Sequence, residues 1–221
     1  MIVVIGSPRL RPGSPERLSE AAGLAAGIAL AARGPGRQVQ LVGRVGEDPA
    51  GESVLLALAR NGIGHAATLR DAVHPTAVVP APAEVDPDLF ADPADAPEVE
   101  WSSLGPPGTA TLDSGDLELA LRYLDGFSVV VIAEPLESSS LEIVAEAAAY
   151  AGAVLVVLAP TGSQPETVPA GSIVLEAPAS DPDGAFARTV GAFAAALDTG
   201  SDPAEALEAA TAAEGWQRAE G

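Results

Sequence analysis

The sequence predicts a single α/β domain with a doubly wound, mostly parallel sheet. Three observations lead to this fold class. Short apolar runs alternate with alanine-rich helical stretches, the 221 residues show no internal repeat, and the later strand-like runs are apolar throughout, as in central parallel strands. A chain of this length buries a real core, so we treat residues 1–221 as one domain. Ligands of such sheets bind at the carboxyl ends of the strands.

The first sixty residues contain two expected strands and two expected helices. Ile2 to Ile5 is a β-branched run, typical of a buried first strand. Ser14-Pro15-Glu16 combines an N-cap residue, a proline at the first helical position and an early acid, which predicts a helix that runs to Arg33. The next elements expected are a strand at Gln38 to Val42 and a helix from Asp48 or Pro49 to Asn61-Gly62.

Residues 64–113 are expected to form a lid and an insert. Strand-like pieces lie around His65 to Leu69 and Thr76 to Val79, and we expect His65 and His74 to be ordinary sheet residues. Pro80 through Asp113 is dense in Pro, Asp and Glu and has no Arg, which is typical of a loop or insert. The apolar residues within it suggest that part of the insert packs on its own domain or on another chain. They are Leu89-Phe90 and Trp101.

Regular alternation of helices and strands returns in the second half of the chain. Its strands are apolar and short, and its helices carry serine or aspartate caps. Helices are predicted at Asp116 to Leu124, Ser138 to Tyr150, Gly184 to Leu197 and Asp202 to Ala213, and strands at Ser128 to Ile132, Ala153 to Leu158 and Ile173 to Leu175.

The composition excludes several function classes. The chain has 11 basic and 31 acidic residues, a net charge of −20, and all of its basic residues are arginines. An acidic chain with no basic stripe does not suit nucleic acid, and without lysine a Walker-type P-loop is impossible. Without cysteine, and with its two histidines nine residues apart, the chain has no thiolate or HExxH zinc site. No apolar run has the ~18 residues of a membrane span, so we expect a soluble, cytoplasmic protein.

One motif points to a known family. The run Leu41-Val42-Gly43-Arg44-Val45-Gly46-Glu47-Asp48-Pro49-Ala50-Gly51-Glu52, followed by Asn61-Gly62-Ile63, resembles a stretch of ribokinase/PfkB carbohydrate kinases. Weaker similarities keep the same register. They are the first-strand glycine at Gly6-Ser7, the helix at Ala21 to Gly34, Pro75-Thr76 in the lid, Glu134-Pro135 after a buried strand, and the last two helices. The resemblance implies a ribokinase-like fold with a small lid of short strands.

The residues that carry chemistry in this family are missing. The resemblance implies an early sugar-binding Asp, a Gly-Gly pair and an Asn, and these positions fall on Arg11, Ala21-Ala22 and Ala26. Asn61 is the only asparagine, so the family's Asn-x-x-Glu magnesium motif is absent. After Pro160 the chain goes almost straight to its last helices, which omits most of the region that builds the nucleotide side. We therefore expect a degenerate, truncated member.

The phosphate-binding GAGD loop of these kinases can be aligned in two ways. One alignment places Gly184-Ala185-Phe186-Ala187 on the motif, with Ala187 at the position of the catalytic base. The other places Asp181-Pro182-Asp183-Gly184 there, with Gly184 at that position. Either way the loop is damaged, because proline donates no N–H and two carboxylates repel a phosphate. We interpret Asp181 and Asp183 as caps of the following helix.

Three functions remain open. The leading hypothesis is a family member without phosphotransfer that acts as a binding, regulatory or structural subunit, with no cofactor, no metal and no catalytic residue. The first alternative is an active minimal sugar or nucleoside kinase that uses Mg-ATP, with Asp183 as base and the Gly184 region as anion hole. The second is a small-molecule sensor in which Arg11 contacts an anionic ligand.

The expected partners are protein rather than nucleic acid or membrane. The resemblance implies a homodimer, because lid strands in this family often clasp a second subunit. A different protein partner, or a small-molecule ligand, is equally compatible with the hydrophobic content of the chain.

Overall fold

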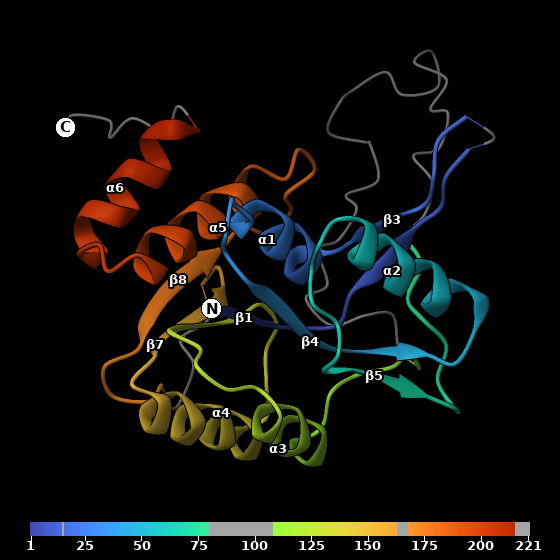
Figure 1. The fold of residues 1–221 in the computed structure, drawn as a ribbon, viewed down its shortest axis with the longest axis horizontal. Coiled ribbons are helices and arrows are strands. Elements are labelled where there is room, and N and C mark those ends of the chain that lie inside the picture. The colour runs from blue at the N-terminus through green and yellow to red at the C-terminus, as the bar shows by residue number, and fades with distance from the viewer. Residues whose placement is uncertain (15, 80–107, 163–167, 215–221) are drawn as a thin grey trace.

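A computed structural model describes residues 1–14, 16–79, 108–162 and 168–214 (Figure 1). The strands in these ranges are β1 (Ile2–Ile5), β2 (Arg9–Arg11), β3 (Glu20–Ala22), β4 (Val39–Gly46), β5 (Thr68–Asp71), β6 (Val129–Ile132), β7 (Val154–Pro160) and β8 (Ile173–Ala177). The helices are α1 (Leu24–Ala32), α2 (Pro49–Arg60), α3 (Ser114–Arg122), α4 (Ser138–Ala151), α5 (Ala185–Asp198) and α6 (Pro203–Ala213). Within the described ranges, no helix is both long enough and apolar enough for a membrane span.

One parallel sheet forms the centre of the molecule, with the strand order β5-β4-β1-β6-β7-β8. Ile2 of β1 lies opposite Val39 of β4 on one side and Val129 of β6 on the other. The chain first builds the sheet outward from β1 to β5, and then returns to β6 and builds it outward to β8. This reversal between β1 and β6 is the doubly wound arrangement that the sequence predicts.

Helices cover both faces of the sheet (Figure 1). Residues of α1, α2, α5 and α6 pack in one core cluster, which contains Val4 of β1 and Phe193 of α5. Residues of α3 and α4 pack in a second cluster, which contains Val3 and Ile5. Neighbouring residues of β1 belong to different clusters because side chains alternate along a strand. Both faces of β1 and β6 are therefore buried, which explains their continuous apolar sequences.

The helix predicted from Ser14 is wrong over its first part. β2 and β3 instead pair as an antiparallel hairpin, with a bridge between Ser14 and Arg17 near its tip, and α1 begins only at Leu24. Leu10 and Ala21 of the hairpin are buried, and both strands contact α2. Packing against α2 overrides the local helix signal, because helix propensity differs by less than about 1 kcal/mol per ordinary residue.

The position predicted for the lid strands also needs correction. The first expected piece is β5, which pairs with β4 and extends the main sheet. The second makes one bridge to the hairpin, between Val78 and Leu10. The small two-stranded sheet is β2–β3, at residues 9–22, and the second predicted piece lies beside it, since Leu10 of β2 donates to the carbonyl of Ala77 and accepts the N–H of Val79. Residues 80–107 of the insert, with Leu89-Phe90 and Trp101, lie outside the described residues.

The other predicted elements are present. Each strand and helix predicted from Gln38 to Asn61 and from Asp116 to Ala213 is found, with ends that differ by a few residues. The largest difference is in β4, which continues through the glycines of the family-like motif to Gly46.

Candidate functional site

The reversal of strand order marks the place to search for a site. In open parallel sheets, ligands bind outside the carboxyl ends of the strands where the order reverses, which here lies between β1 and β6. Gly6 and Ser7 follow β1 directly, and Ala133 and Glu134 follow β6. These two strand ends are neighbours in the sheet, and their side chains define the first part of the candidate site.

Glu134 is a buried carboxyl group at this position. Its side chain belongs to a residue that is only 9% exposed, and its Oε2 accepts the backbone N–H of Ser7 at 2.9 Å. Burial raises the pKa of Glu134, while the Ser7 N–H and the positive charge of Arg9 act in the opposite direction. Gly6 lets α1 pack closely on this strand end, since a Cβ there would lie 2.9 Å from the Cβ of Ala25. A buried acid that faces a cation is a group able to recognise a polar ligand.

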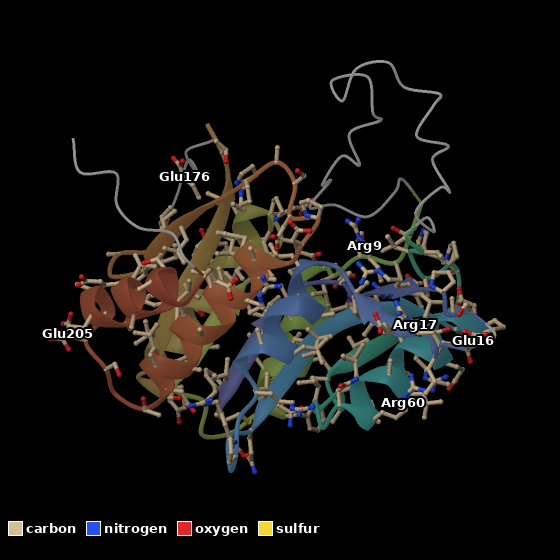
Figure 2. The ribbon with its side chains drawn as sticks, turned by 90° about the horizontal axis from the view of Figure 1, so that it is seen from above. Arg9, Glu16, Arg17, Arg60, Glu176 and Glu205 are labelled. Carbon is tan, nitrogen blue, oxygen red and sulfur yellow. The ribbon has the colours of Figure 1, made fainter. Side chains whose placement is uncertain are left out.

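Arg9, on β2, is the arginine whose charge acts on Glu134. Burial lowers the pKa of its guanidinium, and Glu134 partly restores it. Its aliphatic part lies along the backbone of Gly23 at the start of α1, within 3.4 Å of where a Cβ would be. Figure 2 labels Arg9 on the same side of the molecule as Arg17, and away from Glu205 of α6.

Arg11, the arginine predicted to bind a ligand, has a cross-strand partner. It lies opposite Glu20 in the hairpin, with 3.7 Å between Nη1 and Oε2, and both side chains are about half exposed. Exposed pairs of this kind contribute at most about 1 kcal/mol, so the contact does not prevent a ligand role. The ligand-binding role of Arg11 stays a prediction. The cation that acts on Glu134 is Arg9 and not Arg11.

The second part of the candidate site is the N-terminus of α5. Here the carboxylate of Asp181 accepts two backbone N–H groups, from Phe186 at 3.0 Å through Oδ1 and from Ala187 at 2.9 Å through Oδ2. Both N–H groups belong to the first turn of α5, where an α-helix has no internal acceptor for them. The interpretation of Asp181 as a cap is confirmed. The geometry is that of an anion bound at a helix N-terminus, with the anion supplied by the chain itself.

Asp183 and Gly184 lie directly before α5. Gly184 is the N-cap residue and has a φ of 68°, a conformation that favours glycine over a residue with a side chain. Asp183 is exposed, and its backbone carbonyl accepts a hydrogen bond of 2.7 Å from Nη1 of Arg188. Their catalytic and anion-binding roles remain predictions, because geometry alone does not show whether either group reacts.

Arg188 is the one arginine of α5, and it is engaged by Glu214. Nε lies 3.0 Å from Oε1 and Nη2 lies 2.8 Å from Oε2, which is a two-pronged contact. The hydrogen bonds that Arg188 donates to Glu214 raise the pKa of Arg188, and the same bonds lower the pKa of Glu214. The arginine near the start of α5 is therefore paired with a carboxylate at the end of α6.

The family-like turn before α2 is structural. Asp48 caps α2, since its Oδ1 accepts the N–H of Gly51 at 2.7 Å, and the same oxygen accepts the hydroxyl of Thr76 at 2.8 Å. Its Oδ2 accepts the backbone N–H of Thr76 at 2.8 Å. Burial alone would raise the pKa of Asp48, but these hydrogen bonds lower it. Asp48 thus joins α2 to the chain that follows β5.

A second structural cluster lies at the ends of β4 and β5. Arg44 contacts Asp71 at 3.3 Å and Asp116 of α3 at 2.8 Å. Asp71 also accepts the backbone N–H groups of His74 and Val73, and together with the His74 ring these hold the pKa of Asp71 well below its usual range. His74 is therefore a partner of Asp71. The prediction that it is a sheet residue is wrong.

Sequence reasoning missed Arg9 and Glu134 as a pair. Glu134-Pro135 enters the sequence analysis only as a similarity, although a lone acid directly after a wholly apolar run predicts a buried carboxyl at a strand end. The sequence does not indicate a role for Arg9, because it predicts a loop before a helix where the structure has a hairpin.

Comparison with protein-family models identifies one family. The model described as pfkB family carbohydrate kinase matches residues 15–176. Similar solved structures include a PfkB protein from Polaromonas sp. JS666, with 18% identity, a TM-score of 0.60, and 98% of this chain and 96% of that chain covered. A fructokinase from Vibrio cholerae O395, in its fructose, ADP and calcium ion bound form, has 17% identity, a TM-score of 0.62, and coverage of 97% and 90%.

A third solved structure is Arabidopsis thaliana ribokinase complexed with ribose and ATP, with 19% identity, a TM-score of 0.58, and coverage of 96% and 90%. No curated protein matches the sequence. At these identities the structural likeness establishes the fold, which is ribokinase-like as predicted, and the family model covers most of the chain. The chain belongs to the pfkB family of carbohydrate kinases.

Proposed function

We propose that this family member does not transfer phosphoryl groups and acts by binding, as a regulatory or structural subunit. The observation that carries the proposal is the double hydrogen bond from the start of α5 to Asp181. The resemblance implies that N–H groups at this place hold a phosphate in active kinases. Here the carboxylate of Asp181 accepts hydrogen bonds from both N–H groups.

Mg-ATP does not fit the residues present at this place. A nucleotide phosphate would have to displace Asp181 and would meet a second carboxylate at Asp183, each costing about 1 kcal/mol at 4 Å in water-like dielectric and more if shielded. Arg188 is paired with Glu214, and its charge already acts on Asp181 and Asp183. Among the residues that the structure describes, no group of three or more histidine and acidic side chains is arranged to hold a metal ion.

The catalytic base is the second missing part. Neither alignment of the loop leaves a carboxylate at the position of the base, since one gives Ala187 and the other Gly184. Asp183 is one residue early, and its backbone is bonded to Arg188. A base must come within hydrogen-bond reach of the hydroxyl it deprotonates, and a shift of one residue at a helix start points a side chain in another direction.

The direct test is an assay of ADP release. The purified chain is incubated with Mg-ATP and a panel of sugars and nucleosides, with an active family kinase as positive control. We expect no release above that of a heat-treated sample, and no rise of the melting temperature with Mg-ATP. Turnover that is lost in Asp183→Asn but kept in Glu208→Gln, an exposed change on α6, would instead support the active minimal kinase.

A second candidate function, a small-molecule sensor, is supported by the buried Glu134 beside Arg9 at the reversal of strand order. A carboxyl group accepts hydrogen bonds from ligand hydroxyls, and a guanidinium binds a ligand carboxylate or phosphate. This pair suits a small hydroxylated anion better than a neutral ligand. The sensor hypothesis predicted this chemistry at Arg11.

Substitutions of Arg9, Glu134 and Arg11 allow a matched experiment. Melting temperatures are recorded with a panel of neutral sugars, sugar acids and hydroxy acids, for the wild type and for Arg9→Ala, Glu134→Gln and Arg11→Ala. Sensing predicts a saturable rise with an acidic ligand that disappears in the first two variants and persists in Arg11→Ala. A rise lost only in Arg11→Ala would return the site to the hairpin, and no rise with any ligand would contradict the sensor hypothesis.

A further inference from the structure

The end of α2 carries the only asparagine of the chain, and a glycine follows it. Both Asn61 and Gly62 are exposed. Asparagine is a thermolabile residue, because its side-chain amide reacts with the next backbone nitrogen. Glycine has no Cβ to hinder that approach, and a Cβ built at Gly62 would meet no atom of a non-adjacent residue within 4 Å. The pair is therefore a candidate for a covalent modification that needs no enzyme.

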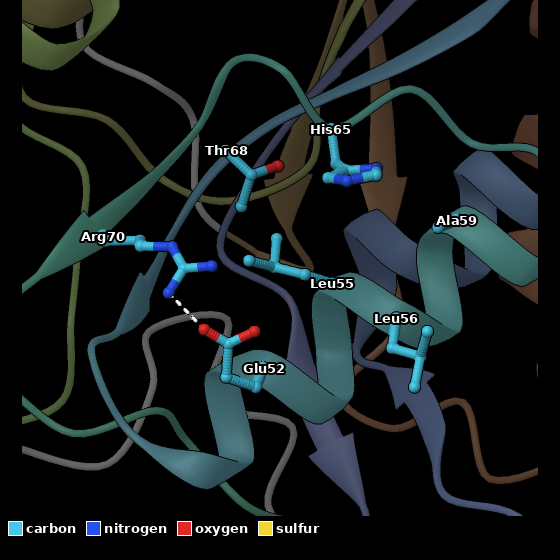
Figure 3. A pocket seen from close by; sticks show the side chains of 7 residues that line it. All are labelled: Glu52, Leu55, Leu56, Ala59, His65, Thr68 and Arg70. Carbon is cyan, nitrogen blue, oxygen red and sulfur yellow. Dashed lines mark hydrogen bonds and ion pairs between the residues drawn. The ribbon is translucent and has the colours of Figure 1, made fainter.

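Water, the other reactant, reaches this turn. A hollow of about 380 Å³ lies between α2 and β5, and its lining includes Ala59, before the turn, and His65, after it. Figure 3 shows Ala59 near the end of α2 and His65 on the segment that leaves the turn, both away from the ion pair of Glu52 and Arg70. The turn between them thus lies beside an open hollow and in contact with solvent.

The reaction is an internal cyclisation followed by hydrolysis. The backbone nitrogen of Gly62 gives its proton to a solvent base and forms a bond to Cγ of Asn61, while the bond from Cγ to Nδ2 breaks and Nδ2 leaves as ammonia with a proton from solvent. Water then adds to one carbonyl carbon of the succinimide ring and breaks its bond to the Gly62 nitrogen. Opening at Cγ gives aspartate, and opening at the main-chain carbonyl gives isoaspartate. Either product carries a carboxylate in place of the neutral amide, and water is the only co-reactant.

The hydrogen bonds of the folded turn oppose the cyclisation. The N–H of Gly62 donates to the carbonyl of Ala59 at 2.9 Å, as is usual for a glycine that ends a helix. The amide that must leave is held as well, since Nδ2 of Asn61 donates to the carbonyl of Ala57 at 2.8 Å. The nucleophile and the leaving group are thus both bonded back to α2, and they meet when its last turn opens.

An arginine of the neighbouring helix keeps this turn closed. Arg33 follows α1 directly, and its Nη1 donates to the backbone carbonyl of Asn61. That carbonyl belongs to the same peptide group as the Gly62 nitrogen. A guanidinium on the oxygen also makes the N–H more acidic, but only in the closed turn, where Ala59 already accepts this N–H. The net effect of Arg33 is therefore to slow the reaction.

We propose that Asn61-Gly62 is a site of spontaneous deamidation whose rate is set by opening of the last turn of α2, with Arg33 as the residue that holds the turn closed. The modification places a negative charge at the carboxyl end of α2, where the helix dipole disfavours it. The modified chain is therefore less stable than the unmodified one, and its melting temperature is lower.

Isoaspartate has a further consequence, because it lengthens the main chain by one carbon atom. Ile63, which is 2% exposed, donates its N–H to the carbonyl of Leu58 at 3.0 Å across this turn. On the other side of the turn, Arg60 donates to the carbonyl of Ser19 at 2.8 Å and so ties α2 to the chain before β3. A longer main chain between Arg60 and Ile63 disturbs both contacts, and the modification thus loosens α2 from the hairpin.

The test follows residue 61 by peptide mapping with mass spectrometry, and isoaspartate-specific methylation identifies the isoaspartyl product. The full chain is kept for weeks in one mildly alkaline buffer, either folded or unfolded in guanidinium chloride. We expect the acid to accumulate in both samples, at least about 10-fold more slowly in the folded one, because only its opened fraction reacts. Equal rates overturn the gating by the turn, and absence of product at residue 61 in either sample overturns the site.

Variants test the role of Arg33. Arg33→Ala removes the bond to the carbonyl of Asn61 and is expected to speed deamidation of the folded chain about 3-fold, the effect of one lost hydrogen bond. Arg122→Ala removes an arginine of α3 whose side chain is 78% exposed, and this matched control is expected to react like the wild type. Asn61→Gln keeps an amide but needs a larger ring, so no product is expected at this residue.

The same variants in guanidinium chloride separate the fold from the local sequence. Arg33→Ala, Arg122→Ala and the wild type are expected to react at one rate when unfolded, because the contact of Arg33 exists only in the folded chain. A folded Arg33→Ala that reacts no faster than Arg122→Ala contradicts the role of Arg33, and so does a difference that persists after unfolding. Melting temperatures show that each variant is folded during the incubation.

Discussion

Asp48 and Asp181 use the same chemistry at the N-termini of two helices. Each carboxylate accepts N–H groups from the first turn of a helix, α2 in one case and α5 in the other. The surroundings differ. Asp48 also accepts both polar groups of Thr76 and so connects α2 with the segment after β5, whereas Asp181 binds only the start of its own helix.

The comparison separates a structural aspartate from one that, under the proposed function, closes a site. The family-like motif that carries Asp48 is retained, and its network of hydrogen bonds explains why a turn of this sequence folds this way. Asp181 lies at the place where the resemblance implies a bound phosphate. A carboxylate there satisfies the helix as a phosphate would, and this allows the fold to persist without the ligand. Five predictions test the difference.

The largest expected effect is that of Asp48→Ala. This change removes the cap of α2 and leaves the N–H and hydroxyl of the buried Thr76 without their acceptor. Loss of a cap costs about 1 kcal/mol, and an unsatisfied buried polar group about 1–3 kcal/mol, so we expect about 3 kcal/mol less free energy of unfolding. Urea unfolding followed by circular dichroism measures it. A loss below about 1 kcal/mol would make Asp48 an ordinary cap like Asp181.

The next effect depends on pH. The pKa of Asp48 is lower in the folded state than in the unfolded chain, so its ionised form stabilises the fold above the unfolded pKa. This contribution is lost as the pH falls through the folded pKa. We therefore expect the stability difference between wild type and Asp48→Asn to be constant from pH 8 to 6 and to shrink below the ordinary aspartate pKa. A difference that grows on acidification would contradict the assignment.

These two aspartates also show what could be read from the sequence. Alternating apolar runs predicted the sheet, because burial of both faces demands continuous apolar strands such as β1 and β6. The motif from Leu41 to Glu52 predicted the turn that Asp48 organises. Asp181 was predicted as a cap from its position before a helix, a local signal that survives folding.

Other features could not be read in this way because they depend on distant parts of the chain. The hairpin forms because Leu10 and Ala21 are buried and its strands contact α2. The residues around Ser14 contain no pattern that predicts this packing. Glu134 meets the N–H of Ser7 across 127 residues. The edge position of β5, and with it the hollow beside α2, follows from the order of strands in the sheet, which periodicity does not specify.

An intermediate effect is expected for Thr76→Val, which keeps the shape of the side chain and removes its hydroxyl. That oxygen accepts the N–H of Gly46 at 2.8 Å and donates to Asp48. The buried N–H of Gly46 would lose its acceptor, and we expect a loss of about 1–2 kcal/mol. If unfolding in urea shows Thr76→Val as stable as the wild type, the network around Asp48 is not cooperative.

A smaller loss of stability, with a gain of binding, is expected for Asp181→Ala. Removing the carboxylate costs about 1 kcal/mol as a lost cap and frees the N–H groups of Phe186 and Ala187. Inorganic phosphate should then raise the melting temperature of the variant and not that of the wild type. A phosphate-dependent rise in the wild type would show that Asp181 does not close the site. No rise in either protein would mean that the N–H groups alone are too weak to hold an anion.

The smallest effect is expected for Asp202→Ala, at the start of α6. Asp202 accepts the N–H of Ala204 at 2.9 Å and a longer bond of 3.4 Å from Glu205, and it is exposed. Water can replace it, so we expect about 0.5 kcal/mol, and no phosphate response because Glu205 lies in the same turn. This variant separates the two explanations of Asp181. If Asp202→Ala also gains phosphate binding, any uncapped helix of this protein attracts anions. Phosphate binding by Asp181→Ala would then not identify the α5 N-terminus as a closed site.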